Sequence, residues 1–140
     1  MNMPVLLVQL AGQRIALPAL EIDSVIKLDK ITPVPGVPPH IIGISSLRSR
    51  ALTVIDCAKM FGVIDYDSNG TKHAAVLNFE GHDYALLVDM VEDVVDALTD
   101  PVPVPGGAGE IWSKISDGLI ETQVGPAMLI KVDTVINNLH

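Results

Sequence analysis

Apolar and polar residues alternate with a period of two along most of the chain, the pattern of β-strands with one buried face. Runs rich in Val, Ile and Leu are separated by clusters of Gly, Pro, Asn and Asp, which are typical of turns. The pattern predicts ten short strands, at Val5–Leu10, Arg14–Leu17, Ile22–Leu28, Ile41–Leu47, Ala51–Ile55, Ala74–Phe79, Tyr84–Val88, Met90–Val95, Ile115–Val124 and Ala127–Val132.

Short helices are predicted only after the fifth and tenth strands. Asp56 is a plausible N-cap for a helix over residues 57–61, and Asp133 is one for a terminal helix from Thr134 to Leu139. Two proline-rich stretches, residues 31–39 and 101–107, are expected to be irregular loops.

The two halves of the chain resemble each other. Four segments match in the same order: Leu10–Leu17 with Phe79–Leu86, Ile22–Ile26 with Val91–Val95, Val34–Gly36 with Val104–Gly106, and Leu52–Asp56 with Leu129–Asp133. Chance similarity between strand patterns is the alternative. A duplicated unit explains the shared order and predicts an all-β fold of two five-stranded barrels related by an internal pseudo-repeat.

Composition excludes several classes of function. A net charge of -8 with only nine scattered basic residues argues against binding to nucleic acid or to an anionic membrane surface. No apolar run is long enough to span a membrane, and Met1–Pro4 does not start a signal peptide. Cys57 is the single cysteine, so no internal disulfide can form. We therefore expect a soluble, cytoplasmic protein.

The sequence offers no catalytic or metal-binding constellation. The four histidines lie far apart, and we expect no metal and no cofactor. Cys57 as a nucleophile, or Asp56 with Asp133 as a carboxylate pair, would define an enzyme, but core packing and helix capping explain these residues better. A surplus of apolar residues with few aromatics favours a binding module with exposed apolar surface.

Arg48 stands out between two apolar strands of an acidic chain. Its guanidinium could fork onto a carboxylate or carbonyl of a partner, which lysine does poorly. A solvated turn arginine, or one held by an internal acid, is an equally good interpretation.

The segment around Arg48 also carries a family resemblance. Residues 41–49, IIGISSLRS, and 51–56, ALTVID, resemble the CheW signature I-K-G-V-x-N-L-R-G followed by P-x-x-D-L. Residues 31–39 are similar to the family's V-T-x-I-P-N-x-P-x, and residues 86–94 to its I-V-V-D-x-V-x-x-V. The resemblance spans Val5 to Leu139.

This resemblance implies two SH3-like β-barrels and a non-enzymatic adaptor. The implied partners are the regulatory domain of a CheA-type histidine kinase and the cytoplasmic tips of chemoreceptors, in arrays at the inner membrane. The partner-binding residues that it implies are Ile22, Ser24, Val25, Gly43, Ser46, Arg48 and Val94. It also implies one CheW-like domain over residues 1–140, with subdomains at about 14–72 and 73–139 and the N-terminal strand a candidate for exchange between them.

Departures from the signature keep two alternatives open. Ser46 replaces its asparagine, Ser49 its glycine and Thr53 its proline, and Ser24 stands where many members carry a glutamate that could pair with the arginine. One alternative is a divergent adaptor of a non-flagellar chemosensory pathway. The other is a small-ligand-binding β-barrel, which predicts an enclosed apolar pocket.

Overall fold

A computed structural model describes residues 3–10, 12–28, 30–38, 41–57, 72–103 and 116–137. Within them the chain forms ten strands, one 3₁₀ turn and one helix. The strands are β1 (Pro4–Leu10), β2 (Gln13–Pro18), β3 (Ser24–Leu28), β4 (Ile41–Leu47), β5 (Arg50–Asp56), β6 (Lys72–Phe79), β7 (His82–Val88), β8 (Met90–Asp96), β9 (Ser116–Thr122) and β10 (Gly125–Ile130). The turn is η1 (Ala19–Glu21) and the helix is α3 (Val132–Asn137).

The ten predicted strands are all present, with ends displaced by a few residues at most. The third begins at Ser24 instead of Ile22, because η1 follows Pro18 directly. The terminal helix begins at Val132, so the prediction that Asp133 caps it is wrong. Burial of Val132, Val135 and Ile136 at helical spacing sets its start. The helix expected over residues 57–61 lies outside the described residues, apart from Cys57.

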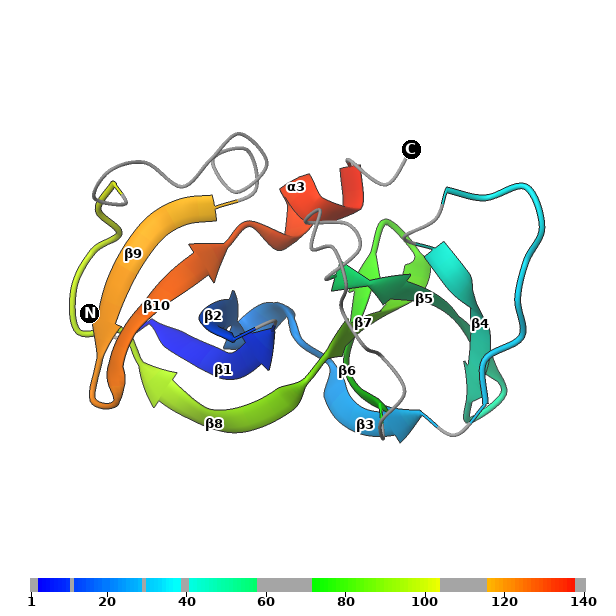
Figure 1. Ribbon diagram of the computed structural model, residues 1–140, viewed down its shortest axis with the longest axis horizontal. Helices are drawn as coiled ribbons and strands as arrows, with labels where there is room; N and C mark the ends of the chain where they lie inside the picture. Colours follow the sequence, from blue (N-terminus) through cyan, green and yellow to red (C-terminus); the bar gives the residue numbers. More distant parts are fainter. Residues whose placement is uncertain are drawn as a thin grey trace.

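The strands form two five-stranded sheets that lie side by side (Figure 1). Sheet A has the order β8-β1-β2-β10-β9, and sheet B has the order β3-β6-β7-β5-β4. Each position in one sheet has a counterpart in the other, and the two hairpins, β1-β2 and β6-β7, are exchanged. The fold of two repeated five-stranded units is therefore confirmed. The subdomain limits at 14–72 and 73–139 stay a prediction.

The register corrects one part of the internal alignment. Ile15 of β2 pairs with Met128, and its counterpart Tyr84 of β7 pairs with Thr53, so Thr53 corresponds to Met128. The alignment of Leu52–Asp56 with Leu129–Asp133 is thus wrong by two residues. A shift of two keeps every side chain on the same face, so the apolar pattern could not detect it.

Among the described residues, three apolar clusters hold the molecule together. One fills the concave side of sheet A and includes Leu7 and Ile120, and another fills that of sheet B and includes Leu52 and Val54. The largest lies between the sheets, combining residues of β1, β2, β6 and β7 with the buried face of α3 (Figure 1). Because this shared cluster contains residues of both sheets, it joins them as one packed body.

Candidate functional site

The edge strands β3 and β8 occupy equivalent places and present equivalent side chains. Val25 on β3 pairs with Ala75 and is 42% exposed, and Val94 on β8 pairs with Leu6 and is 54% exposed. An isolated exposed valine is ordinary, but the same position is exposed on both edges. The two predicted partner-facing valines are therefore presented to solvent, one by each sheet.

Ile22 is half-buried and packs against the shared cluster between the sheets. It also lines an open cavity of about 590 Å³. The other lining residues are Leu20, Glu21, Asp23, Arg50, Leu77, Asn78, Phe79, Asp83 and Val132. Leu20 is 89% exposed at its margin. Burial, and secondarily the nearby Asp133, raise the pKa of Glu21.

Gly43 is buried in β4 and lies against the backbone of the loop that precedes the strand. A Cβ at this position would lie 2.3 Å from the Thr32 carbonyl oxygen, and φ is +154°. Thr32 and Ile44 exchange two backbone hydrogen bonds of 2.8 Å there. Close backbone packing accounts for this glycine, and a direct contact with a partner stays a prediction.

Ser46 and Arg48 lie at the exposed end of the β4-β5 hairpin, while Ser24 is half-buried at the start of β3. Arg48 and Ser49 form the turn with φ of 50° and 67°. No ion pair joins Arg48 to another described residue. The structure thus places Ile22, Ser24 and Val25 along one edge of sheet B, Gly43, Ser46 and Arg48 on its other edge, and Val94 in sheet A.

Arg50, at the start of β5, does form ion pairs, and its role was not predicted from the sequence. Its Nε and Nη2 donate to the two Asp83 carboxylate oxygens at 3.1 and 2.8 Å, and Nη2 lies 3.3 Å from Asp23 Oδ2. Hydrogen bonds from Asn78, then Arg50, lower the pKa of Asp83. The overlooked signal was the charge at position 83 of the second hairpin, which the repeat aligns with Arg14.

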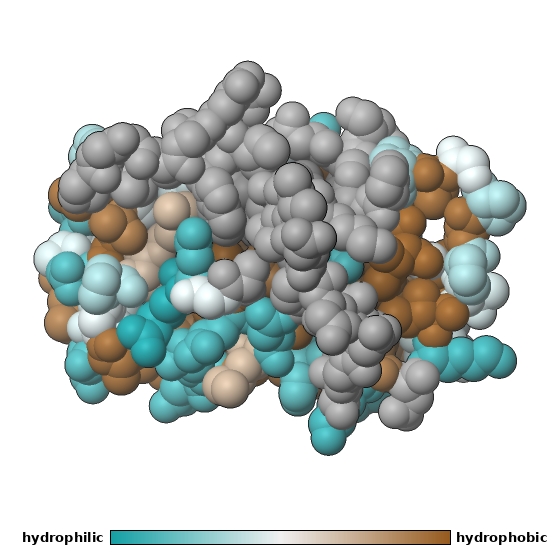
Figure 2. All heavy atoms as spheres, in the orientation of Figure 1, coloured by the Kyte–Doolittle hydropathy of each residue, from teal (hydrophilic) through white to brown (hydrophobic). Residues whose placement is uncertain are grey.

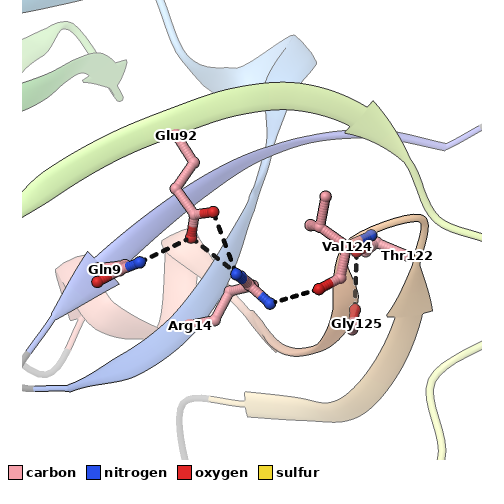
Figure 3. Close-up of polar contacts among 6 residues, drawn as sticks. All are labelled: Gln9, Arg14, Glu92, Thr122, Val124 and Gly125. Carbon is pink, nitrogen blue, oxygen red and sulfur yellow. Dashed lines mark hydrogen bonds and ion pairs between the residues drawn. The ribbon is translucent and has the colours of Figure 1, made fainter.

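Arg14 forms the corresponding cluster in sheet A (Figure 3). Its Nε and Nη2 donate to the Glu92 carboxylate at 2.9 and 3.3 Å, and Nη1 donates to the Val124 carbonyl at 2.7 Å. Gln9 donates to the same carboxylate at 3.4 Å. The hydrogen bond from Arg14 lowers the pKa of Glu92. The cluster ties β1, β2 and β8 to the β9-β10 turn.

The rival functions find no support in the described residues. Burial, and secondarily Asp56, raise the pKa of the Cys57 thiol to about 12, so it is not a nucleophile near neutral pH. The apolar cavity beside Cys57 measures about 10 Å³, barely enough for one water molecule. No group of three potential metal ligands occurs in the described part of the chain. None of its helices is long and apolar enough to cross a membrane.

Comparison with known proteins gives these surfaces a context. The model of the CheW-like domain matches residues 4–140. The chain belongs to the CheW family. It is 27% identical to the chemotaxis protein CheW of Thermotoga maritima, over 96% of this chain and 88% of that protein. It is 28% identical to the chemotaxis protein CheW of Klebsiella aerogenes, over 91% and 76% of the two chains.

The fold agrees with a crystal structure of the same family. The scaffolding protein TtCheW from Thermoanaerobacter tengcongensis superposes with a TM-score of 0.81 at 25% identity, covering 94% of this chain and 90% of that one. As a member of the CheW family, the chain is a non-catalytic scaffolding protein of chemotaxis signalling. Its partners are therefore chemotaxis signalling proteins.

Proposed function

We propose that this CheW-family scaffold couples chemoreceptors to a CheA-type histidine kinase in the cytoplasm. The observation that supports the proposal most is the pair of equivalent edge strands on one shared core. Val25 on β3 and Val94 on β8 give the body two apolar contact positions, one on each sheet. An adaptor for two partners needs two separate faces of this kind.

The proposed receptor face lies on sheet B. It combines Val25, the cavity beside Ile22 and the turn arginine Arg48, with Ser24 and Ser46 at its margins. The exposed apolar side chains suit the apolar stripe of a receptor helix. The cavity beside them is also lined by the charged residues Glu21, Asp23, Arg50 and Asp83, so the helix must leave these groups hydrated or compensate them. Figure 2 shows apolar side chains gathered over the sheet B end of the molecule, on the right.

The proposed kinase face lies on sheet A. Val94 and Met90, both at least half exposed, lie on the edge strand β8, which the Arg14–Glu92 ion pair links to β2 across β1. A rigid edge strand suits a barrel-to-barrel contact with the kinase regulatory domain, since little conformational entropy is lost on binding.

Coupling follows from the shared core. When both faces belong to one packed body, a shift of the receptor on one face changes the position of the kinase on the other. The free energy that biases the kinase must come from contacts that differ between its two states. The scaffold supplies the geometry of those contacts, and no chemical step is required of it.

The test is capture of each partner by variants of each face. We expect Arg48→Glu to weaken capture of a receptor-tip fragment about tenfold and Val94→Glu to weaken capture of the kinase regulatory domain by a similar factor, each sparing the other partner. Val102→Glu is the matched control, because Val102 is also 52% exposed but lies beside β9, on the edge of sheet A opposite β8. Unchanged binding in both face variants would refute the assignment of the faces.

A further inference from the structure

A second open cavity, of about 560 Å³, lies between the two edge strands of sheet B. Its walls are the edges of β3 and β4 together with the β4-β5 turn. The lining residues are Ile26, Lys27, Leu28, Lys30, Thr32, Ile44, Ser45, Ser46, Leu47, Ser49, Arg50 and Ala51. We call this cavity the edge groove.

The backbone of Ser46 faces the edge groove. Ile44 directs its N–H and C=O away from β5, to Thr32, and residues two apart on a strand point the same way. Ser46 therefore turns its own N–H and C=O toward the groove. In sheet A the counterpart Glu121 uses both groups: its C=O accepts from Leu98 N–H at 2.7 Å, and its N–H donates to Thr99 Oγ1 at 3.1 Å.

No such hydrogen bond joins the Ser46 backbone to another described residue. An edge strand with an unused N–H and C=O can pair with an added extended segment. The groove also has an apolar base, because Leu28 belongs to the cluster inside sheet B, and Ile26 and Leu47 pack against it. Ile44, 42% exposed, adds apolar surface at the rim.

Among the described residues, the charged side chains that line the groove have one sign. Lys27 and Lys30 are exposed, and neither forms an ion pair with a described residue. Asp83 and Asp23 already compensate the third cation, Arg50. None of the lining residues in the described part of the chain is acidic, although the whole protein carries a net charge of -8. Asp29, between the two lysines in sequence, lies outside the described residues.

We infer that the edge groove binds an extended acidic segment of a partner protein. The segment pairs its backbone with Ser46, places carboxylates beside Lys27 and Lys30, and lays small apolar side chains on Ile26 and Leu47. This inference rests on the groove alone. It holds whether or not the receptor and kinase faces proposed above are correct.

The test uses a short capped peptide of alternating glutamate and valine as the probe. Titration into the ¹⁵N-labelled protein is expected to shift the amide resonances of β3 and β4, and to slow exchange of the Ser46 amide. Lys27→Glu with Lys30→Glu is expected to weaken binding about tenfold, since two exposed attractive pairs become repulsive. The control is Lys131→Glu, at a partly exposed lysine outside the groove; because it changes the net charge by two and the double variant by four, it is compared with each single variant, Lys27→Glu and Lys30→Glu.

A backbone variant tests the pairing independently of charge. Ser46→Pro removes the N–H donor without breaking a β4-β5 ladder bond, so it should abolish binding while the amide spectrum stays folded. Ser46→Ala keeps the donor and should bind as the parent does. Three results would each overturn the inference. A lysine–valine peptide could bind as tightly as the glutamate–valine peptide, or Lys131→Glu could weaken binding as much as the groove variants do. The third is the absence of any resonance shift in β3 and β4 at about 1 mM peptide.

Discussion

At the scale of single residues, two glycines decide how the proline-rich loops meet the sheets. Gly43 and Gly118 occupy equivalent bulges in β4 and β9, and each lies against a loop carbonyl, that of Thr32 or Val102. The family motif identifies Gly43 in the sequence. Gly118 could not be identified, because its counterpart becomes apparent only from the strand register.

We predict that Gly43→Ala and Gly118→Ala each lower the free energy of unfolding by roughly 3 kcal/mol. The added Cβ would lie 2.3 or 2.2 Å from a backbone carbonyl oxygen that cannot move away alone. Gly12→Ala is the control, because φ is +79° there but no atom lies within 4 Å, so it should cost only about 1 kcal/mol. Equal losses in all three variants, measured by urea unfolding, would show that the loop contact is unimportant.

The β4-β5 turn contains a strained serine where the family signature has glycine. Ser49 has φ of 67°, whereas the equivalent turn position of the β6-β7 hairpin is Gly81 with φ of 84°. We predict that Ser49→Gly stabilises the protein by about 0.5–1 kcal/mol, and that Gly81→Ser destabilises it by about 1 kcal/mol. Thermal unfolding of both variants checks this. A loss of stability in Ser49→Gly would contradict it.

The arginines show where inference from the sequence ends. Arg48 lies in the β4-β5 turn and Arg50 lies two residues later, at the start of β5, and only three-dimensional pairing decides which one meets Asp83. The motif directs attention to Arg48, which is exposed. Arg50 meets carboxylates from β7 and from the segment before β3, contacts that depend on the parallel pairing of β5 with β7.

At the scale of elements, the two sheets use the same three positions for their ion-pair clusters, and the charge changes sign at one of them. Arg14 corresponds to Asp83, Gln9 to Asn78 and Glu92 to Asp23. In sheet A the cation Arg14 binds the edge-strand carboxylate Glu92, whereas in sheet B the anion Asp83 binds Arg50 of β5. The alignment of the two halves of the sequence matches these residues position by position. Their pairing required the exchanged hairpins, which the local pattern does not encode.

These clusters predict a dependence of stability on acid. The pKa values of Glu92 and Asp83 are lowered in the folded protein. The two ionised carboxylates therefore contribute fully to the free energy of unfolding above their ordinary pKa values of 4.5 and 3.8, and this contribution is lost as the pH falls through the lowered pKa values. Glu92→Gln and Asp83→Asn should therefore flatten the loss of stability below about pH 4.5, measured by urea unfolding at each pH.

The control for this prediction is Glu21, whose pKa shifts in the opposite direction. The pKa of Glu21 is raised, so its ionisation opposes folding, and Glu21→Gln should increase stability at pH 7. The same acid dependence in the parent protein and in both ion-pair variants would contradict the assignment.

Strands were the most predictable elements. Their period of two and their flanking turn residues are local signals, so all ten were located from sequence. The start of α3 could not be located from the sequence, because burial of Val132 against the shared cluster outweighs the capping preference of Asp133.

At the scale of the whole molecule, the shared cluster makes the two sheets one unit. Leu86 is 2% exposed within it, and Leu86→Ala should cost about 2–5 kcal/mol. Both sheets should lose stability together, which amide exchange at Leu7 in sheet A and Leu52 in sheet B can follow. Separate transitions for the two sheets would show that they fold independently, and would contradict a single domain over residues 1–140.

The most direct test of the account is whether both partners bind at once. The protein, saturated with a receptor-tip fragment, is titrated with the kinase regulatory domain, and the mass of the complexes is measured by analytical ultracentrifugation. Two separate faces on one body predict a ternary complex that contains all three proteins. Displacement of the receptor fragment by the kinase domain would mean that both bind the same surface, and would contradict the account.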